Sequence, residues 1–174
     1  MSGEKLSADE SEVSEFIQTL SKRITELDLT PEQLYNADET CLNWRQLPTK
    51  TIITPEEKKV SGRKLQKERI TLIVCANASG THKLKLLVVG MSKKPRALKS
   101  VKILTLSVTY MYQNCAWVTK EVFLDWYKNN FVLQVKDELR KKLPKKAHLL
   151  LDNVPGHPDK DELKIKTANQ DCGV

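Results

Sequence analysis

The sequence lacks several features that define whole classes of protein. No stretch approaches the roughly 18 consecutive apolar residues of a membrane-spanning helix, which excludes such a span. The first twelve residues are polar and acidic, which is the wrong chemistry for a signal or transit peptide. The four cysteines form no CxxC pair, which favours ordinary thiols in a reducing compartment over a disulfide framework. Only a zinc site assembled from distant segments stays open.

Negative charge is missing from a long central stretch. Asp and Glu are absent from residues 69–120, and residues 58–120 carry fourteen Lys and Arg against one acid. Residues 1–40 instead carry ten acids and three bases, so the net charge of +7 conceals a strong asymmetry. Each phosphate contact needs a cation, and a neighbouring carboxylate would oppose it, so this clustering favours a nucleic-acid partner. A solvated basic face without a partner is the alternative.

The N-terminal third combines a helix with a short strand. Apolar residues recur at helical spacing over residues 9–27, which predicts an amphipathic helix. A short helical turn is expected at residues 29–32, followed by a short strand over residues 34–38 that ends in an acid. Residues 41–67 hold two prolines and a basic stretch, which indicates a loop or an extended arm.

The remainder alternates strands and one long helix. Residues 70–78 and 82–90 are predicted to form a hairpin, because turn-forming residues lie between them. A basic loop and a short strand at residues 103–108 follow, then a helix from Thr119 to about residue 142 and a buried strand at residues 147–151. The residues expected in the core on and just before this helix are Trp117, Val122, Phe123, Trp126, Phe131, Val135 and Leu139. One α/β domain with a mixed sheet flanked by helices is therefore predicted.

Two acids follow apolar strands and form the candidate site. Asp38 comes after one predicted strand and Asp152 after another, so the two converge if their strands are neighbours. Paired carboxylates are ligands suited to Mg²⁺ or Mn²⁺. Glu39 would point to the opposite face of the strand from Asp38 and is the poorer ligand. The alternative for Asp152 is a turn starter that bonds its own backbone.

Several motifs in order resemble one family. They are residues 35–40 (YNADET), 67–72 (KERITL), 75–84 (CANASGTHKL), 92–96 (SKKPR), 116–117 (AW), 149–153 (LLLDN) and 155–158 (PGHP). Together they resemble the DDE superfamily endonuclease domain of the pogo/Tigger transposase group, which is also seen in Jerky-like proteins and centromere protein B. The resemblance covers most of residues 12–158.

This resemblance implies a ribonuclease H-like fold with a metal site. Asp38 would end the first strand, the hairpin would supply the second and third, and Asp152 would end the fourth. Both acids match metal-ligating positions of the family's acidic triad, whereas His157 is expected to be a capping or structural residue. The third acid has no counterpart, so the domain is expected to be truncated after the fourth strand.

The expected organisation has three parts. Residues 1–29 form an acidic amphipathic helix and linker, residues 30–158 an incomplete DDE domain, and residues 159–174 a polar tail.

Three functional hypotheses follow. The first is a transposase-derived nucleic-acid-binding domain without catalytic activity, which contacts the DNA backbone with low sequence specificity. The residues expected to bind nucleic acid are Lys64, Lys67, Arg69, Lys83, Lys85, Lys93, Lys94 and Arg96. The second is a Mg²⁺- or Mn²⁺-dependent DNA endonuclease or transposase. The third is a protein-interaction remnant that self-associates or pairs with a full-length relative. A nuclear location is inferred from the family.

Overall fold

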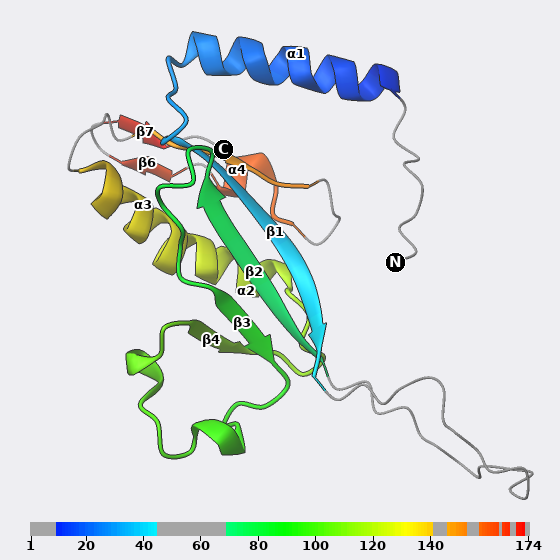
Figure 1. Ribbon diagram of the computed structural model, residues 1–174, viewed down its shortest axis with the longest axis vertical. Coiled ribbons are helices and arrows are strands. Elements are labelled where there is room, and N and C mark those ends of the chain that lie inside the picture. Colours follow the sequence, from blue (N-terminus) through cyan, green and yellow to red (C-terminus); the bar gives the residue numbers. More distant parts are fainter. Residues whose placement is uncertain are drawn as a thin grey trace, which may run out of the picture.

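A mixed five-stranded sheet forms the centre of the protein (Figure 1). The computed structural model describes residues 10–44, 69–140, 146–152, 157–163, 165–167 and 170–172. The strands are β1 (Leu34–Asn43), β2 (Arg69–Asn77), β3 (Leu87–Gly90), β4 (Thr109–Tyr112) and β5 (His148–Leu150), in the spatial order β4-β3-β2-β1-β5. The pairs β1–β2 and β2–β3 are antiparallel, whereas β1–β5 and β3–β4 are parallel. The predicted α/β class with a mixed sheet is confirmed.

One long helical segment covers one face of this sheet. It consists of α2 (Lys120–Trp126), a π-helical segment η3 (Tyr127–Phe131) and α3 (Val132–Leu139), and Thr119 caps its start by accepting a hydrogen bond from the Val122 N–H. Alternate strand residues point at this helix and are buried: Tyr35, Ala37, Ile73, Cys75, Leu87 and Val89. They pack against helix residues that include Phe123, Trp126, Phe131, Val135 and Leu139. The core therefore lies between this helix and the sheet.

The π-helical segment has a visible origin in the sequence. The apolar residues Trp126 and Phe131 are five positions apart, one more than an α-helix needs to return to the same face. The wider π turn accommodates the extra residue and keeps both side chains in the core, with ring centroids 5.8 Å apart. The predicted helix over residues 119–142 is thus present as far as it is described, with this local widening.

β1 is longer than the sequence pattern indicated. The predicted strand stopped at Asp38, but β1 continues to Asn43 because β2 pairs with it along its whole length, from Tyr35 beside Asn77 to Asn43 beside Arg69. Asp38 therefore lies in the middle of a strand, and the prediction that it ends one was wrong. Pairing with a partner strand, which a local pattern does not show, made the difference.

The hairpin is confirmed, but its second strand is interrupted. β2 and β3 pair antiparallel, yet only residues 87–90 are in β3, while Lys83 forms an isolated bridge with Ala76. Between that bridge and the ladder, the second strand carries one more residue than β2, as in a β-bulge. The strand predicted at residues 103–108 was wrong. Its beginning forms the 3₁₀ turn η2 (Ile103–Thr105), and the strand at this edge is β4.

The remaining elements lie around this core. α1 (Glu10–Glu26) confirms the predicted N-terminal helix, and Figure 1 shows it lying apart from the sheet. Val13, Phe16 and Ile17 on its apolar stripe are exposed. The short helix α4 (Lys160–Leu163) is attached to the core by a hydrogen bond from the Tyr127 hydroxyl to the Leu163 carbonyl, 2.7 Å long. β6 (Ile165–Thr167) and β7 (Gln170–Cys172) form a separate antiparallel pair. None of the helices described here has the length and hydropathy needed to cross a membrane.

Candidate active site

The two predicted acids belong to neighbouring segments of the sheet, with Asp38 on β1 and Asp152 two residues after the end of β5. β5 pairs parallel with β1, with Leu34 beside His148 and Asn36 beside Leu150. Continuing this register by two residues brings Asp38 to the level of Asp152, and adjacent strands are about 4.8 Å apart. The predicted convergence of the two chain segments is therefore present, although Asp152 follows the fifth strand along the chain because β4 precedes it.

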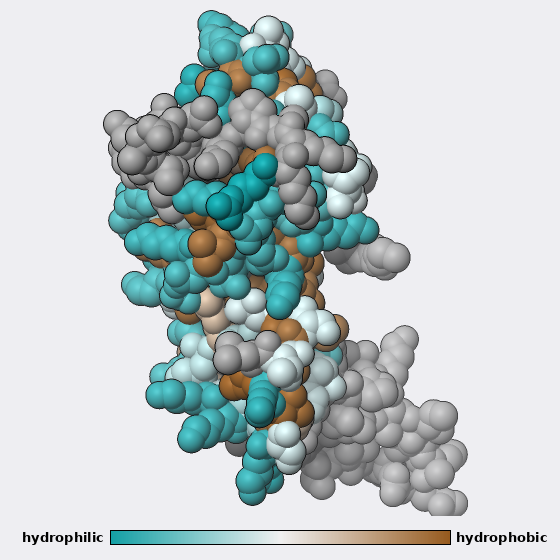
Figure 2. Space-filling model, turned by 90° about the vertical axis from the view of Figure 1, so that its left-hand side faces the viewer, coloured by the Kyte–Doolittle hydropathy of each residue, from teal (hydrophilic) through white to brown (hydrophobic). Residues whose placement is uncertain are grey.

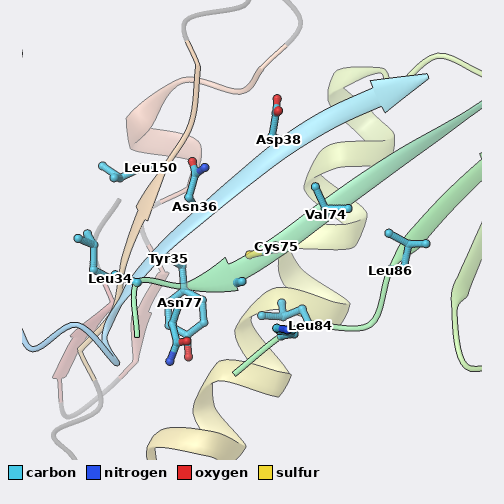
Figure 3. A pocket seen from close by; sticks show the side chains of 13 residues that line it. Leu34, Tyr35, Asn36, Asp38, Val74, Cys75, Asn77, Leu84, Leu86 and Leu150 are labelled. Atoms are coloured by element: carbon cyan, nitrogen blue, oxygen red, sulfur yellow. The ribbon is translucent and has the colours of Figure 1, made fainter. Parts of the chain in front are cut away.

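Asp38 projects from the face of the sheet opposite α2 and α3. It lines a groove of about 450 Å³, and Figure 3 shows Asn36 and Asp38 projecting from β1 on the same side, away from Tyr35. Most of the other lining residues are apolar: Leu34, Val74, Ala76, Leu84, Leu86 and Leu150 are among them. One oxygen of the Asp38 carboxylate accepts a hydrogen bond from the Glu39 N–H, 2.8 Å away. The acid thus lies beside an apolar groove and is partly satisfied by its own strand.

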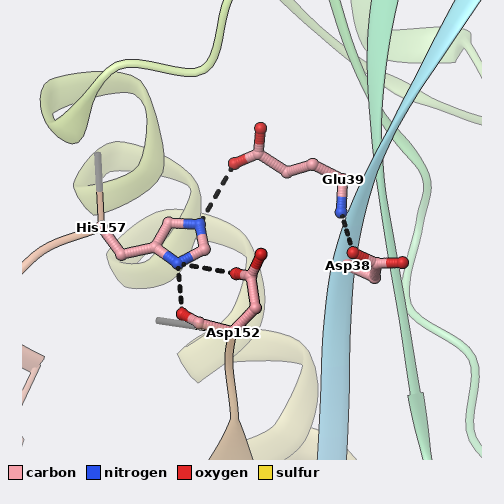
Figure 4. A network of polar contacts seen from close by, with 4 residues as sticks. All are labelled: Asp38, Glu39, Asp152 and His157. Atoms are coloured by element: carbon pink, nitrogen blue, oxygen red, sulfur yellow. Dashed lines mark hydrogen bonds and ion pairs between the residues drawn. The ribbon is translucent and has the colours of Figure 1, made fainter. Parts of the chain in front are cut away.

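Asp152 is held by a histidine (Figure 4). The Nδ1 atom of His157 lies 3.1 Å from the Asp152 carboxylate and 3.1 Å from the Asp152 carbonyl oxygen. The Nε2 atom of the same ring lies 3.2 Å from the carboxylate of Glu39. Both ring nitrogens can donate hydrogen bonds at once only when the imidazole carries both protons. Through the contacts of its two ring nitrogens, His157 connects the segment after β5 to β1.

The surroundings of His157 restrict its motion. Its side chain is only 11% exposed, and its ring lies 4.9 Å from that of Phe123, centroid to centroid. Burial raises the pKa of the Glu39 carboxyl above its usual range. The hydrogen bond and charge of His157 oppose this increase, whereas the carboxylates of Asp152 and Asp38 add to it.

Glu39 and Asp38 lie on alternate faces of β1, as predicted. The contact between Glu39 and His157 was not predicted, because it joins residues 118 positions apart.

The donor set does not fit a complete metal centre. Among the residues with described positions, no group of three or more His, Cys, Asp or Glu side chains could hold a metal ion. The Asp152 carboxylate is directed at His157, whereas Asp38 projects into the groove on the face of the sheet opposite α2 and α3. Two carboxylates could hold Mg²⁺ only with most of its coordination shell filled by water. The described residues by themselves therefore do not supply the clamp on both attacking and leaving oxygens that two-metal phosphodiester chemistry requires.

The predicted nucleic-acid-binding residues fall into two groups. Lys93, Lys94 and Arg96 are exposed on the connection between β3 and β4, at the end of the sheet where Arg69 starts β2. Lys99 and Lys102 on the same connection are exposed too. We call the set Arg69, Lys93, Lys94, Arg96, Lys99 and Lys102 the basic end. Lys83 and Lys85 are also exposed, but Lys83 pairs with Ala76, about 23 Å along β2 from Arg69. Lys64 and Lys67 lie outside the described residues.

Trp117 was wrongly predicted to be a core residue. It is 53% exposed, and the guanidinium of Arg69 lies 3.8 Å from its ring centroid. Trp126, predicted with it, is fully buried. The difference arises because Trp117 precedes the helix in an irregular turn, outside the periodic pattern that buries Trp126. The polar turn residues before Trp117, Gln113 and Asn114, were the available signal.

Comparison with known proteins assigns this arrangement to a family. The family described as DDE superfamily endonuclease matches residues 67–174, more than half of the chain. The chain belongs to the DDE superfamily endonuclease family. The mixed five-stranded sheet with its helices is consistent with the ribonuclease H-like fold of this family, and its pogo/Tigger-like character is shown by its relatives. No solved structure matches the chain.

The relatives include Jerky-type and Tigger-type proteins. The chain is 44% identical to human Jerky protein homolog over 93% of its own length and 29% of that relative. It is 37% identical to human Tigger transposable element-derived protein 7, over 98% of its own length and 32% of the relative. It is also 29% identical to CENP-B homolog protein 2 of Schizosaccharomyces pombe over 90% of its own length. The chain thus spans about a third or less of the length of these DDE-family relatives.

Proposed function

We propose that this DDE-family chain is a transposase-derived nucleic-acid-binding domain that does not cleave DNA. The basic end contacts phosphates of the DNA backbone, and the contacts carry no base-sequence information. Nuclear location belongs to the same proposal, because the proposed ligand is DNA. Self-association and pairing with a full-length relative stay predictions of the sequence.

The observation that supports this proposal is the clustering of cations without acids. Five bases lie on the β3–β4 connection, which Figure 1 shows at the end of the sheet where β2 begins with a sixth, Arg69. The sequence holds no Asp or Glu from residue 69 to residue 120. The two 3₁₀ turns of the β3–β4 connection, η1 (Arg96–Leu98) and η2, lie on the same connection as five of these cations. A hydrogen bond of 2.6 Å from the Tyr110 hydroxyl to the Ser92 carbonyl fastens the start of this connection to β4. The start of the segment that carries these cations is therefore held against β4.

The test is the salt dependence of binding to duplex DNA. We expect duplexes of unrelated sequence to bind with similar affinity, and the affinity to fall steeply between about 50 and 200 mM salt. Replacing Lys93, Lys94 and Arg96 by Ala should lower the slope of log K against log salt by about 0.9 for each lost phosphate contact. Fluorescence anisotropy with labelled duplexes measures both quantities.

A matched control removes the same charge elsewhere. Lys22 on α1, Lys128 on η3 and Arg140 just after α3 are exposed bases away from the basic end. Their triple Ala variant should bind like the unaltered chain. Absence of binding at about 50 mM salt, or affinity that does not change with salt, would refute the proposal.

Absence of cleavage is the second part of the proposal and has its own test. Among the described residues, no group of three or more His, Cys, Asp or Glu side chains is placed to hold a metal ion, which supports this part of the proposal. Mg²⁺ or Mn²⁺ binding at Asp38 and Asp152 stays a prediction. A plasmid-nicking assay in the presence of each metal compares the chain with Asp152→Asn. We expect no nicking by either protein, and nicking by the unaltered chain that Asp152→Asn abolishes would establish the endonuclease instead.

A further inference from the structure

Exposed aromatic rings lie at the same end of the sheet as the cations. Trp117 and Tyr112 are 53% and 42% exposed, and Trp44, next to the end of β1, is 54% exposed. Asn43 of β1 pairs with Arg69, whose guanidinium lies over the Trp117 ring, and Gly90 of β3 pairs with Tyr112. All three rings therefore lie at the same end of the sheet as the six residues of the basic end. At the lower end of Figure 2, hydrophilic and hydrophobic residues are interleaved.

The turn that carries Trp117 is held rigidly. Ala116 has φ of 51°, a left-handed conformation that costs a non-glycine residue about 1–2 kcal/mol, and its side chain is fully buried. The Thr71 hydroxyl donates a 2.5 Å hydrogen bond to the Ala116 carbonyl. The side-chain oxygen of Gln113 accepts from the N–H groups of Cys115, at 2.6 Å, and Trp117, at 3.3 Å. A strained residue persists only where its surroundings determine it, and such residues are enriched in ligand-binding sites.

The order imposed on this turn has a clear result. The buried Ala116 directs the next residue outwards, so a large indole stands in solvent on a rigid support instead of joining the core. The guanidinium of Arg69 lies over the ring at 3.8 Å, and Trp117 as a residue remains 53% exposed. Aromatic faces beside a basic groove are the arrangement by which proteins bind unpaired bases, because every base has a π-face that can stack. Paired bases in a duplex are stacked on one another and offer no such face.

We propose that Trp117, supported by Arg69, is a stacking platform for an unpaired nucleobase, so that this end of the sheet binds single-stranded nucleic acid. The inference rests on the proposed phosphate contacts and adds the preference for unpaired bases to them. The cations of the basic end hold the backbone of the strand, while Trp117 stacks on a base. Tyr112 and Trp44 offer further rings along the same end.

The test compares single-stranded and duplex DNA at the same salt concentration. A labelled oligo(dT) of about 20 nucleotides and a duplex of equal length are titrated with the full 174-residue chain and with two variants. Trp117→Phe keeps an aromatic face, whereas Trp117→Leu keeps apolar bulk without one. We expect the unaltered chain to prefer oligo(dT). Trp117→Leu should bind oligo(dT) about tenfold or more weakly, and Trp117→Phe should stay within about threefold of the unaltered chain.

The duplex titration separates the two proposals. Both variants should bind the duplex as the unaltered chain does, which also shows that they are folded. If the unaltered chain binds duplex and oligo(dT) equally, or if Phe and Leu at position 117 lower oligo(dT) binding equally, the stacking platform is refuted while the phosphate contacts stand. If neither DNA is bound at about 50 mM salt, the proposed function fails and the platform with it.

Discussion

Cys75 lies in β2 with its side chain in the core beneath α2 and α3. Only 7% of it is exposed, and burial raises the pKa of its thiol to about 12. Cys41 and Cys115 are exposed. Because the thiolate is the reactive form, the surroundings of each cysteine determine its reactivity.

We therefore expect selective alkylation of the exposed thiols. With iodoacetamide at about pH 8.5, Cys41 and Cys115 should be modified and Cys75 protected, as measured by peptide mass spectrometry. In urea all four cysteines of the chain, Cys75 among them, should react, which is the control. The folded protein favours the neutral Cys75 thiol, so its contribution to stability is complete below about pH 8.5 and is lost as the pH rises towards 12. Rapid modification of Cys75 in the folded protein would contradict this assignment.

His157 shows a second effect at the scale of single residues. Its two nitrogens contact the carboxylates of Asp152 and Glu39, and Phe123 lies against its ring. These contacts fit the predicted structural role, because they fasten the segment after β5 to β1. The direction of the Asp152 side chain is therefore determined by its contact with His157 more than by its position after β5.

At the scale of the element, the end of α1 depends on one residue. The Leu29 N–H donates to the Ile24 carbonyl and the Asp28 N–H to the Thr25 carbonyl, at 3.0 and 3.2 Å. This is the Schellman pattern, and Asp28 occupies its left-handed position with φ of 49°. Glycine usually takes this position because it has no Cβ to crowd the backbone.

Substitutions at Asp28 should therefore change the stability of α1 in opposite directions. Asp28→Gly should stabilise the helix end by up to about 1 kcal/mol, and Asp28→Val should destabilise it by about 1 kcal/mol. Amide hydrogen exchange across residues 13–27 measures the effect, with the amides of β2 as an internal reference. Equal exchange in both variants would show that this cap does not control the helix.

At the scale of the whole molecule, stability depends on the single layer of helix over the sheet. Trp126 is fully buried there, with ring centroids 5.2 Å from Phe123 and 5.8 Å from Phe131. Among the described residues, its indole N–H has no hydrogen-bond partner. A buried donor without a partner costs about 1–3 kcal/mol, so Trp126 stabilises the core by its volume and weakens it by its polar group.

Two substitutions separate these contributions. Trp126→Ala should lower the free energy of unfolding by about 3–5 kcal/mol, because it leaves a large cavity. Trp126→Phe should cost less than about 1.5 kcal/mol, because it removes the unpaired N–H while keeping most of the ring. Urea denaturation gives both values from the shift in midpoint at constant slope. A loss for Trp126→Phe well above about 1.5 kcal/mol would mean that the indole N–H has a partner.

Local patterns in the sequence were sufficient for much of the fold. A mostly apolar run located β2, and helical spacing located α1 and the segment from Thr119. The buried helix residues that were predicted are Phe123, Trp126, Phe131, Val135 and Leu139. Motifs in order identified the family and the positions Asp38 and Asp152. These features depend on neighbours within a few residues, which a sequence displays directly.

The tertiary structure decided what lies beside what. β1 extends past Asp38 because β2 pairs with it. The Asp152 side chain points at His157, whose ring is held in place by the contact of its Nε2 atom with Glu39, 118 positions away along the chain. Trp117 is exposed because the hydroxyl of Thr71, on β2, donates a hydrogen bond to the carbonyl of Ala116 and fixes the turn before it. Each outcome depends on contacts between segments far apart along the chain. Such contacts leave no pattern among neighbouring residues of the sequence, so the geometry of the site could be determined only from the folded sheet.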